Sequence, residues 1–184
     1  MTILIVDMGS QYTHVIWRTL RDLGHEGKIA PKDVPASELA AAEAIILSGG
    51  PSSVTTDNFH SLPAQIKKAD RPVLGICLGH QLIAHTLGGK VVKGKSAEYG
   101  VSKIEVDEPG VILEGLPASF NAWVSHFDEV KKMPVGFVRL AHSDTCGIEA
   151  MENVEKKISS VQFHPEVWHT ENGERIMRNF LKQV

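Results

Sequence analysis

Three residues from distant parts of the chain could together cleave an amide bond. Cys77 follows an apolar run, and His164 and Glu166 stand two positions apart much later in the sequence. A thiol can attack a carbonyl carbon, an imidazole can take and return its proton, and a carboxylate can orient the imidazole. These residue types predict a cysteine hydrolase site.

The residues around Cys77 predict how the thiol is presented. Residues 73–76 are typical of a buried strand and residues 78–87 of a helix, so Cys77 falls at an abrupt strand-to-helix turn, a nucleophile elbow. Gly75 and Gly79 flank it at positions where side chains would collide with the close approach of strand and helix. The positive end of the helix dipole and a neighbouring histidine would both stabilise a thiolate there.

The segment His164-Pro165-Glu166 suits a base and the group that orients it. A spacing of two places both side chains on one face of an extended chain, and the proline holds His164 extended. Glu166 can then accept the second imidazole proton. Taken alone the tripeptide is equally compatible with a turn, so the prediction depends on its pairing with Cys77.

Amide hydrolysis also requires donors for an oxyanion, and two backbone N–H groups are the usual device. Leu78 follows the nucleophile and offers one. Gly50 offers the other, because residues 48–51 follow a strand at 44–47 and lie at the same carboxyl edge of the sheet. An ordinary glycine turn is the alternative for this loop. A phosphate-binding loop is disfavoured because Pro51 lacks an amide donor and no Lys-Ser/Thr pair follows.

Two further segments are candidates for substrate recognition. Gln81 lies one helical turn beyond Cys77, and helical side chains lean toward the N-terminus, so its amide should hang over the elbow. A solvated helix residue is the alternative. Residues 121–128 combine polar groups with an aromatic side chain, which suits a loop that grips a small zwitterion.

Zinc chemistry is the remaining alternative for this set of residues. The possible ligands are Cys77, His80, His85, Cys146 and His164. Neither C-x-x-C nor H-E-x-x-H occurs, so we expect no metal site. Cys146 is interpreted as a spare residue and not as a disulfide partner.

Composition narrows the class of protein. With 184 residues, 42% hydrophobic content and a formal net charge of −3, the chain suits one domain spanning residues 1–184. The lysines are scattered, so we expect no nucleic-acid partner. The apolar start at residues 2–6 is halted by Asp7 and is too short for a membrane span or a signal sequence. We therefore expect a cytoplasmic protein without a membrane role.

Hydrophobic periodicity predicts the elements that position these residues. In the first half, strands at 2–6, 26–30, 44–47 and 73–76 alternate with helices near 12–23, 37–42, 59–68 and 78–87. In the second half, strand-like pieces at 90–93, 101–106, 121–124, 137–141, 147–151 and 158–163 precede a helix at 172–182. The pattern predicts an α/β fold with a single open, largely parallel but mixed central sheet flanked by helices.

The chain resembles the class I glutamine amidotransferases, whose fold is flavodoxin-like, from end to end. Gly-x-Cys-x-Gly-His-Gln together with His-Pro-Glu carries the resemblance. Asp-x-Gly-Ser-Gln-Tyr and Ser-His-x-Asp favour the branch that serves GMP synthesis over the anthranilate, carbamoyl phosphate and CTP branches. The matching segments are residues 7–12, 46–53, 75–81, 88–89, 98–100, 123–130 and 161–166.

The resemblance implies roles for individual residues. Cys77 would attack the side-chain amide carbon of L-glutamine to give a thioester, His164 would activate the hydrolytic water, and Glu166 would orient His164. Gly50 and Leu78 match oxyanion-hole positions. The residues that match segments lining the glutamine pocket or its partner-facing rim are Gln81, Ser125, His126 and Asp128.

The resemblance also implies partners. It implies no cofactor in this chain, because ATP and Mg²⁺ are expected on an ATP pyrophosphatase that receives the ammonia and aminates XMP to GMP. The chain ends soon after its closing helix, so we expect that synthetase to be a separate subunit that activates a weak glutaminase. The alternatives are a glutaminase subunit of another biosynthetic synthase, for example of the anthranilate type, and a non-enzymatic flavodoxin-like binding or redox-sensing module.

Overall fold

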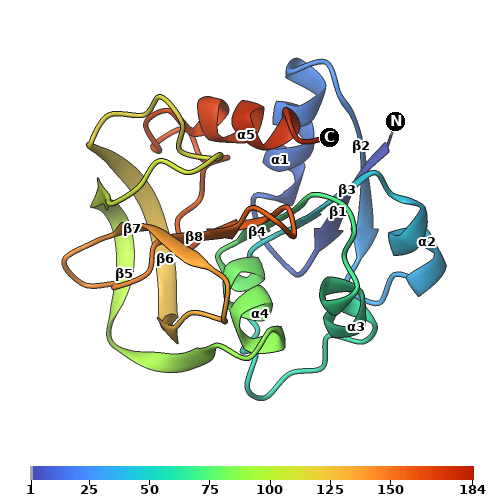
Figure 1. Ribbon diagram of the computed structural model, residues 1–184, viewed down its shortest axis with the longest axis horizontal. Helices are drawn as coiled ribbons and strands as arrows, with labels where there is room; N and C mark the ends of the chain where they lie inside the picture. Colours follow the sequence, from blue (N-terminus) through green and yellow to red (C-terminus); the bar gives the residue numbers. More distant parts are fainter. Residues whose placement is uncertain (1) are drawn as a thin grey trace.

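The computed structural model describes residues 2–184, except the side chains of residues 95 and 96, and it is built on one nine-stranded mixed sheet (Figure 1). The strand order is β2-β1-β3-β4-β9-β8-β7-β5-β6. The strands are β1 (Thr2–Asp7), β2 (Glu26–Pro31), β3 (Ala44–Leu47), β4 (Val73–Ile76), β5 (Lys90–Val106), β6 (Ser119–Lys132), β7 (Val138–His142), β8 (Ala150–Asn153) and β9 (Ile158–Val161). The predicted fold class is confirmed.

Helices cover both faces of the parallel half of the sheet (Figure 1). Helices α1 (Thr13–Asp22) and α5 (Gly173–Leu181) lie on one face, and α2 (Ala36–Ala41), α3 (Leu62–Lys67) and α4 (Leu78–Thr86) lie on the other. Alternate residues of β1 pack into two separate apolar cores. Ile5 lies in the core under α1 and α5, and Val6 lies in the core under α2, α3 and α4. A sheet that is buried on both faces requires this two-residue alternation, and it also requires near-continuous apolar strands such as β3 and β4.

The parallel half determines where the site forms. β4 pairs with β3 on one side and with β9 on the other, with Ile76 opposite Val161. The segments that follow β3, β4 and β9 therefore leave the sheet at the same edge, where open α/β sheets bind ligands. Those segments contain Gly50, Cys77 and His164.

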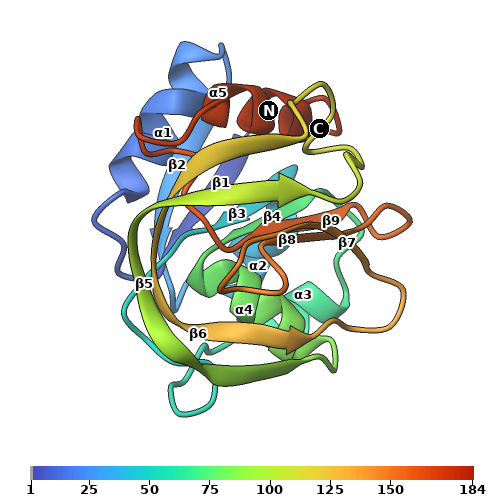
Figure 2. The same cartoon turned by 90° about the vertical axis from the view of Figure 1, so that its left-hand side faces the viewer.

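The antiparallel half contains a long hairpin where the sequence pattern predicted short separate pieces. β5 and β6 pair along most of their length and curve around α4 (Figure 2). The predicted break between residues 93 and 101 was wrong, because Glu98 and Tyr99 continue the strand opposite His126 and Ser125 after a register shift. The mostly polar sequence of residues 93–98, together with Gly100 at φ +119°, interrupts the alternation of polar and apolar residues that predicts a strand.

No helix formed by the described residues is both long enough and apolar enough to cross a membrane.

Candidate active site

Cys77 occupies the predicted elbow between β4 and α4. Its backbone lies at φ 51° and ψ −102°, a strained conformation for a residue with a side chain, and its N–H donates to Val161 O at 2.8 Å. A Cβ on Gly75 would lie 2.6 Å from the Gly79 carbonyl, and one on Gly79 would lie 2.5 Å from Leu47 O. Both glycines are needed for the close approach of helix and strand that holds the thiol above the sheet.

His164 and Glu166 form a buried pair beside Cys77. His164 Nδ1 and Glu166 Oε1 are 2.8 Å apart, so a proton on Nδ1 is donated to the carboxylate and Nε2 is left for the thiol. A Cβ on Gly49 would lie 3.0 Å from His164 Cε1 and 3.5 Å from Cys77 Cβ. The imidazole and the nucleophile therefore border the same small space, which a side chain at position 49 would fill.

The backbone around His164 is fastened to β6. His164 N–H donates to Trp123 O at 2.9 Å, and Thr170 Oγ1 donates to His164 O at 2.6 Å. The same hydroxyl accepts the Trp123 N–H at 2.9 Å. The edge of the Tyr12 ring packs on the imidazole, with ring centroids 5.3 Å apart. These contacts fix the base relative to the pocket wall, which β6 also forms.

The charge of His164 follows from its neighbours. Burial lowers its pKa, but the negative charge of Glu166 and the hydrogen bond with Cys77 outweigh burial and raise the pKa to about 10. A cationic imidazole beside the sulfur stabilises negative charge there and holds a proton ready for a leaving amine.

A cavity of about 360 Å³ opens above the thiol, within the size range of small-molecule sites. It is lined by Gly50, Pro51, Ser52, Ser53, Cys77, Gln81, Lys93, Ser125, His126, Phe127 and Asp128. Cys77 Sγ lies 3.7 Å from Ser125 O. Among the described residues no backbone carbonyl accepts the Gly50 N–H, and Leu78 is the first residue of α4, whose N–H has no partner within the helix. Both amides remain free to serve a ligand.

Other candidate residues have more specific positions than the sequence indicated. Gln81 is buried, and its Nε2 donates to Asp128 O at 2.8 Å and to Gln162 Oε1 at 3.1 Å, so it supports the pocket wall. Asp128 Oδ2 accepts a hydrogen bond from Ser53 Oγ at 3.0 Å. His126 borders the pocket, but its Nδ1 lies 3.0 Å from Asp128 O and its Nε2 lies 2.7 Å from Glu98 Oε2, behind the wall.

Sequence reasoning did not single out several of the lining residues, and Lys93 and Ser53 are two of them. Lys93 brings a positive charge to the pocket, with its Nζ 5.0 Å from the centre of the Phe127 ring, and Ser53 fastens the glycine loop to β6. A charged residue at the end of a predicted strand was the only available signal for Lys93. His80, a possible zinc ligand by residue type, is bonded instead within the core, to Ser160 Oγ at 2.8 Å and Ile148 O at 3.2 Å.

Comparisons with known proteins agree with this geometry. The family model described as glutamine amidotransferase class-I matches residues 4–184. The glutamine-hydrolyzing GMP synthase subunit of Pyrococcus furiosus is 51% identical over 182 residues, 98% of this chain and 97% of that protein. The corresponding subunit of Methanocaldococcus jannaschii is 47% identical over 183 residues, 98% of this chain and 96% of that protein.

Solved structures give the same result. A Thermoplasma acidophilum protein described as a candidate GMP synthase subunit is 39% identical, with a TM-score of 0.93 over 99% of this chain and 92% of that one. A Thermotoga maritima glutamine amidotransferase, 22% identical, has a TM-score of 0.75 over 98% of this chain and 80% of that one and shares the fold. The chain belongs to the class I glutamine amidotransferase family.

Proposed function

We propose that this protein is the glutaminase subunit of a two-subunit GMP synthase and hydrolyses L-glutamine to glutamate and ammonia. The observation that carries the proposal is a Cys77 elbow that lines a cavity and has beside it the buried His164–Glu166 pair, whose Nδ1 and Oε1 atoms are 2.8 Å apart. Near-full-length identity of 51% to the glutamine-hydrolyzing GMP synthase subunit of Pyrococcus furiosus supports the choice of pathway.

The residues divide the reaction into two acyl transfers. Cys77 Sγ attacks the amide carbon of glutamine, and the Gly50 and Leu78 N–H groups stabilise the oxyanion. His164 gives its proton to the departing nitrogen, so ammonia leaves and a thioester remains. His164 then takes a proton from water, which attacks the thioester and releases glutamate and the thiol. Glu166 keeps the imidazole in one tautomer throughout.

The cavity suits a zwitterionic amino acid. Lys93 can pair with the α-carboxylate, and the carboxylate of Asp128 lies on the same wall. The Ser125 carbonyl, close to Cys77 Sγ, can accept a hydrogen bond from the substrate. Gln81 and His126 hold this wall from behind through the Asp128 carbonyl, so in this proposal their contribution to binding is indirect.

We infer that the ammonia passes to a separate ATP-pyrophosphatase subunit that binds ATP, Mg²⁺ and XMP, so that this chain itself needs no cofactor. An exposed aromatic cluster near the base supports a docking surface: Trp168 is 85% and Tyr99 is 80% exposed. Tyr99 packs on Trp123, which stacks on His169. Exposed aromatic side chains of this kind are enriched at protein interfaces. A cytoplasmic location fits these nucleotide substrates.

Ammonia release from glutamine tests the proposal. The chain alone should show weak activity that rises when the synthetase, XMP and ATP are added, and Cys77→Ala should abolish it. His85→Ala, on the exposed side of α4, is the matched control. A glutamine-mimicking electrophile should label Cys77 and leave Cys146 unmodified. An unreactive Cys77, or full turnover that the loaded partner does not change, would contradict the hydrolytic and the regulatory parts respectively.

A further inference from the structure

Four side chains of metal-binding type meet behind the wall of the substrate pocket. Glu98 comes from β5, His126 from β6, and Cys146 and Glu149 from the connection between β7 and β8. One ligand atom from each lies within 4.8 Å of all the others. All four side chains are buried or nearly so, and Glu149 is 0% exposed. None takes part in the proposed hydrolysis.

Within the part of the chain that the structure describes, four polar atoms of this cluster lack hydrogen-bond partners, whereas Thr145 Oγ1 donates to Glu98 Oε1 and Cys146 Sγ donates to Ile148 O at 3.6 Å. Both carboxylate oxygens of Glu149 are buried without a hydrogen-bond partner among the described residues. Glu98 Oε2 and His126 Nε2 approach to 2.7 Å but are not aligned for a hydrogen bond, and neither has another partner among those residues. Buried carboxylates without partners are costly, and a cation at the centre of the cluster would offset that cost.

The Nδ1 atom of His126 already has a hydrogen-bond partner. Nδ1 lies 3.0 Å from the Asp128 carbonyl, which can only accept, so Nδ1 carries a hydrogen, and Nε2 offers a lone pair to the cluster once it has lost its own proton. Metal-binding histidines are commonly oriented by such a bond from the other ring nitrogen to a carbonyl or carboxylate.

We propose that Glu98, His126, Cys146 and Glu149 form a tetrahedral site for Zn²⁺. One sulfur, one imidazole nitrogen and two carboxylate oxygens make a donor set that zinc accepts, whereas Ca²⁺ and Mg²⁺ require oxygen ligands alone. Zinc bonds of about 2.0–2.3 Å place ligand atoms roughly 3.3–3.8 Å apart, so the side chains must close by about 1 Å. A thiolate and two carboxylates against Zn²⁺ leave one net negative charge.

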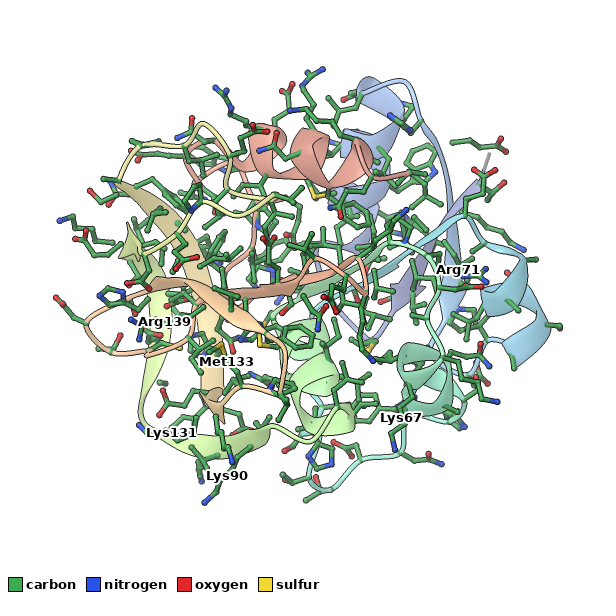
Figure 3. All side chains as sticks on the ribbon, in the orientation of Figure 1. Lys67, Arg71, Lys90, Lys131, Met133 and Arg139 are labelled. Atoms are coloured by element: carbon green, nitrogen blue, oxygen red, sulfur yellow. The ribbon has the colours of Figure 1, made fainter. Side chains whose placement is uncertain are left out.

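Zinc would add a link between the β5–β6 hairpin and the β7–β8 connection. This link would lie immediately behind Ser125, whose carbonyl lies close to Cys77 Sγ. A cavity of about 410 Å³ lies beside the β7–β8 connection, and its lining includes Lys131, Met133, Arg139, Gly147 and Ile148. Figure 3 labels Lys131, Met133 and Arg139 on the same side of the molecule. Arg139 Nη1 donates to Gly147 O at 3.4 Å, within the β7–β8 connection.

Metal binding must displace a proton. Zinc binds cysteine as the thiolate, so the Cys146 thiol must release its proton when the ion binds. Zinc affinity should therefore fall as the pH falls.

Zinc titration of the full chain tests the proposal, in a Cys77→Ala background so that the reactive thiol cannot compete. After chelator treatment, we expect one equivalent of Zn²⁺ to bind in competition with a chromophoric chelator. Co²⁺ in its place should give a thiolate-to-cobalt charge-transfer absorption. Cys146→Ser should remove that absorption, and both Cys146→Ser and Glu149→Gln should weaken zinc binding by at least about tenfold, the smallest loss typical of mutating the groups that support metal ligands.

The control is His85→Ala in the same background, which removes an exposed histidine outside the cluster and should leave the affinity unchanged. Circular dichroism establishes that each variant is folded, and Glu149→Gln serves if Cys146→Ser does not fold. Absence of stoichiometric zinc binding, or equal affinity in the parent and in the folded cluster variants, would overturn the site.

Discussion

Ser53 Oγ donates a hydrogen bond to Asp128 Oδ2 at 3.0 Å, which joins the glycine loop after β3 to β6 across the pocket. Removing this bond in Ser53→Ala should free the loop that carries Gly50. In the proposed mechanism the Gly50 N–H acts on the oxyanion, so we expect kcat to fall about 2- to 10-fold, with a smaller change in KM. Steady-state ammonia release measures both. The control is Thr56→Ala in the same loop, and equal kinetics for the two variants would contradict this role for Ser53.

Glu166→Gln tests how the carboxylate acts on His164. The carboxylate is a main reason why the pKa of His164 is raised to about 10, so the variant should lower that pKa, which an NMR titration of the imidazole can follow. Glutaminase activity should fall by up to about 10⁴-fold, the loss seen when the acid of a serine triad becomes an amide. Glu174→Gln on α5, which removes an exposed carboxylate, should change neither property. A His164 titration that Glu166→Gln leaves unmoved would refute the pairing.

His80 should make the fold sensitive to acid. Complete burial lowers its pKa to about 3, whereas in the unfolded chain it titrates near 6.5. Below pH 6.5 the unfolded state therefore binds more protons, so the free energy of unfolding should decrease as the pH falls from 6.5 toward 3. Urea unfolding at several pH values measures the slope. His80→Asn should be less stable at pH 7 but should flatten that slope, and an equally steep slope in this variant would count against His80 as the cause.

Gly79→Ala tests the elbow. Alanine in a helix is favoured over glycine by about 1 kcal/mol, but the new Cβ would lie 2.5 Å from Leu47 O, and overpacking of this kind costs about 1–3 kcal/mol. The cost of the clash should exceed the gain in helix propensity, so we expect Gly79→Ala to have a lower Tm and to lose activity. Gly147→Ala is the matched control, because nothing lies within 4 Å of its Cβ position. A gain of stability in Gly79→Ala would mean that helix and strand can separate at no cost.

Trp168→Ala tests the docking surface. The side chain is 85% exposed, so its removal should leave the folding stability within about 0.5 kcal/mol. If the synthetase covers it, the affinity of the two subunits should fall roughly 30-fold, the loss of a central aromatic contact worth about 2 kcal/mol. Calorimetry of the complex measures this. Val135→Ala, 97% exposed on the β6–β7 turn, provides the comparison, and equal affinities would place the interface elsewhere.

The sequence revealed the parallel half of the fold because its signals are local. The apolar run before Cys77 and the flanking glycines define the elbow within a few residues, and the two-residue spacing of His164 and Glu166 gives their shared face. The antiparallel half depends on register between strands, which a single sequence does not encode locally. Glu98 therefore fell between two predicted strand pieces, although it pairs opposite His126 in a continuous hairpin. For the same reason a search for compact zinc motifs in the sequence did not find the cluster with Cys146 and Glu149.

The pairing of β4 with β9 also has a consequence for biosynthesis. The nucleophile is translated long before the strand that hydrogen-bonds to its amide, and all the intervening antiparallel strands must emerge from the ribosome first. A nascent chain thus carries an unassembled thiol until its last segments are released, and such long-range closure is slow. Covalent labelling of Cys77 by a substrate mimic would therefore count molecules whose folding is complete.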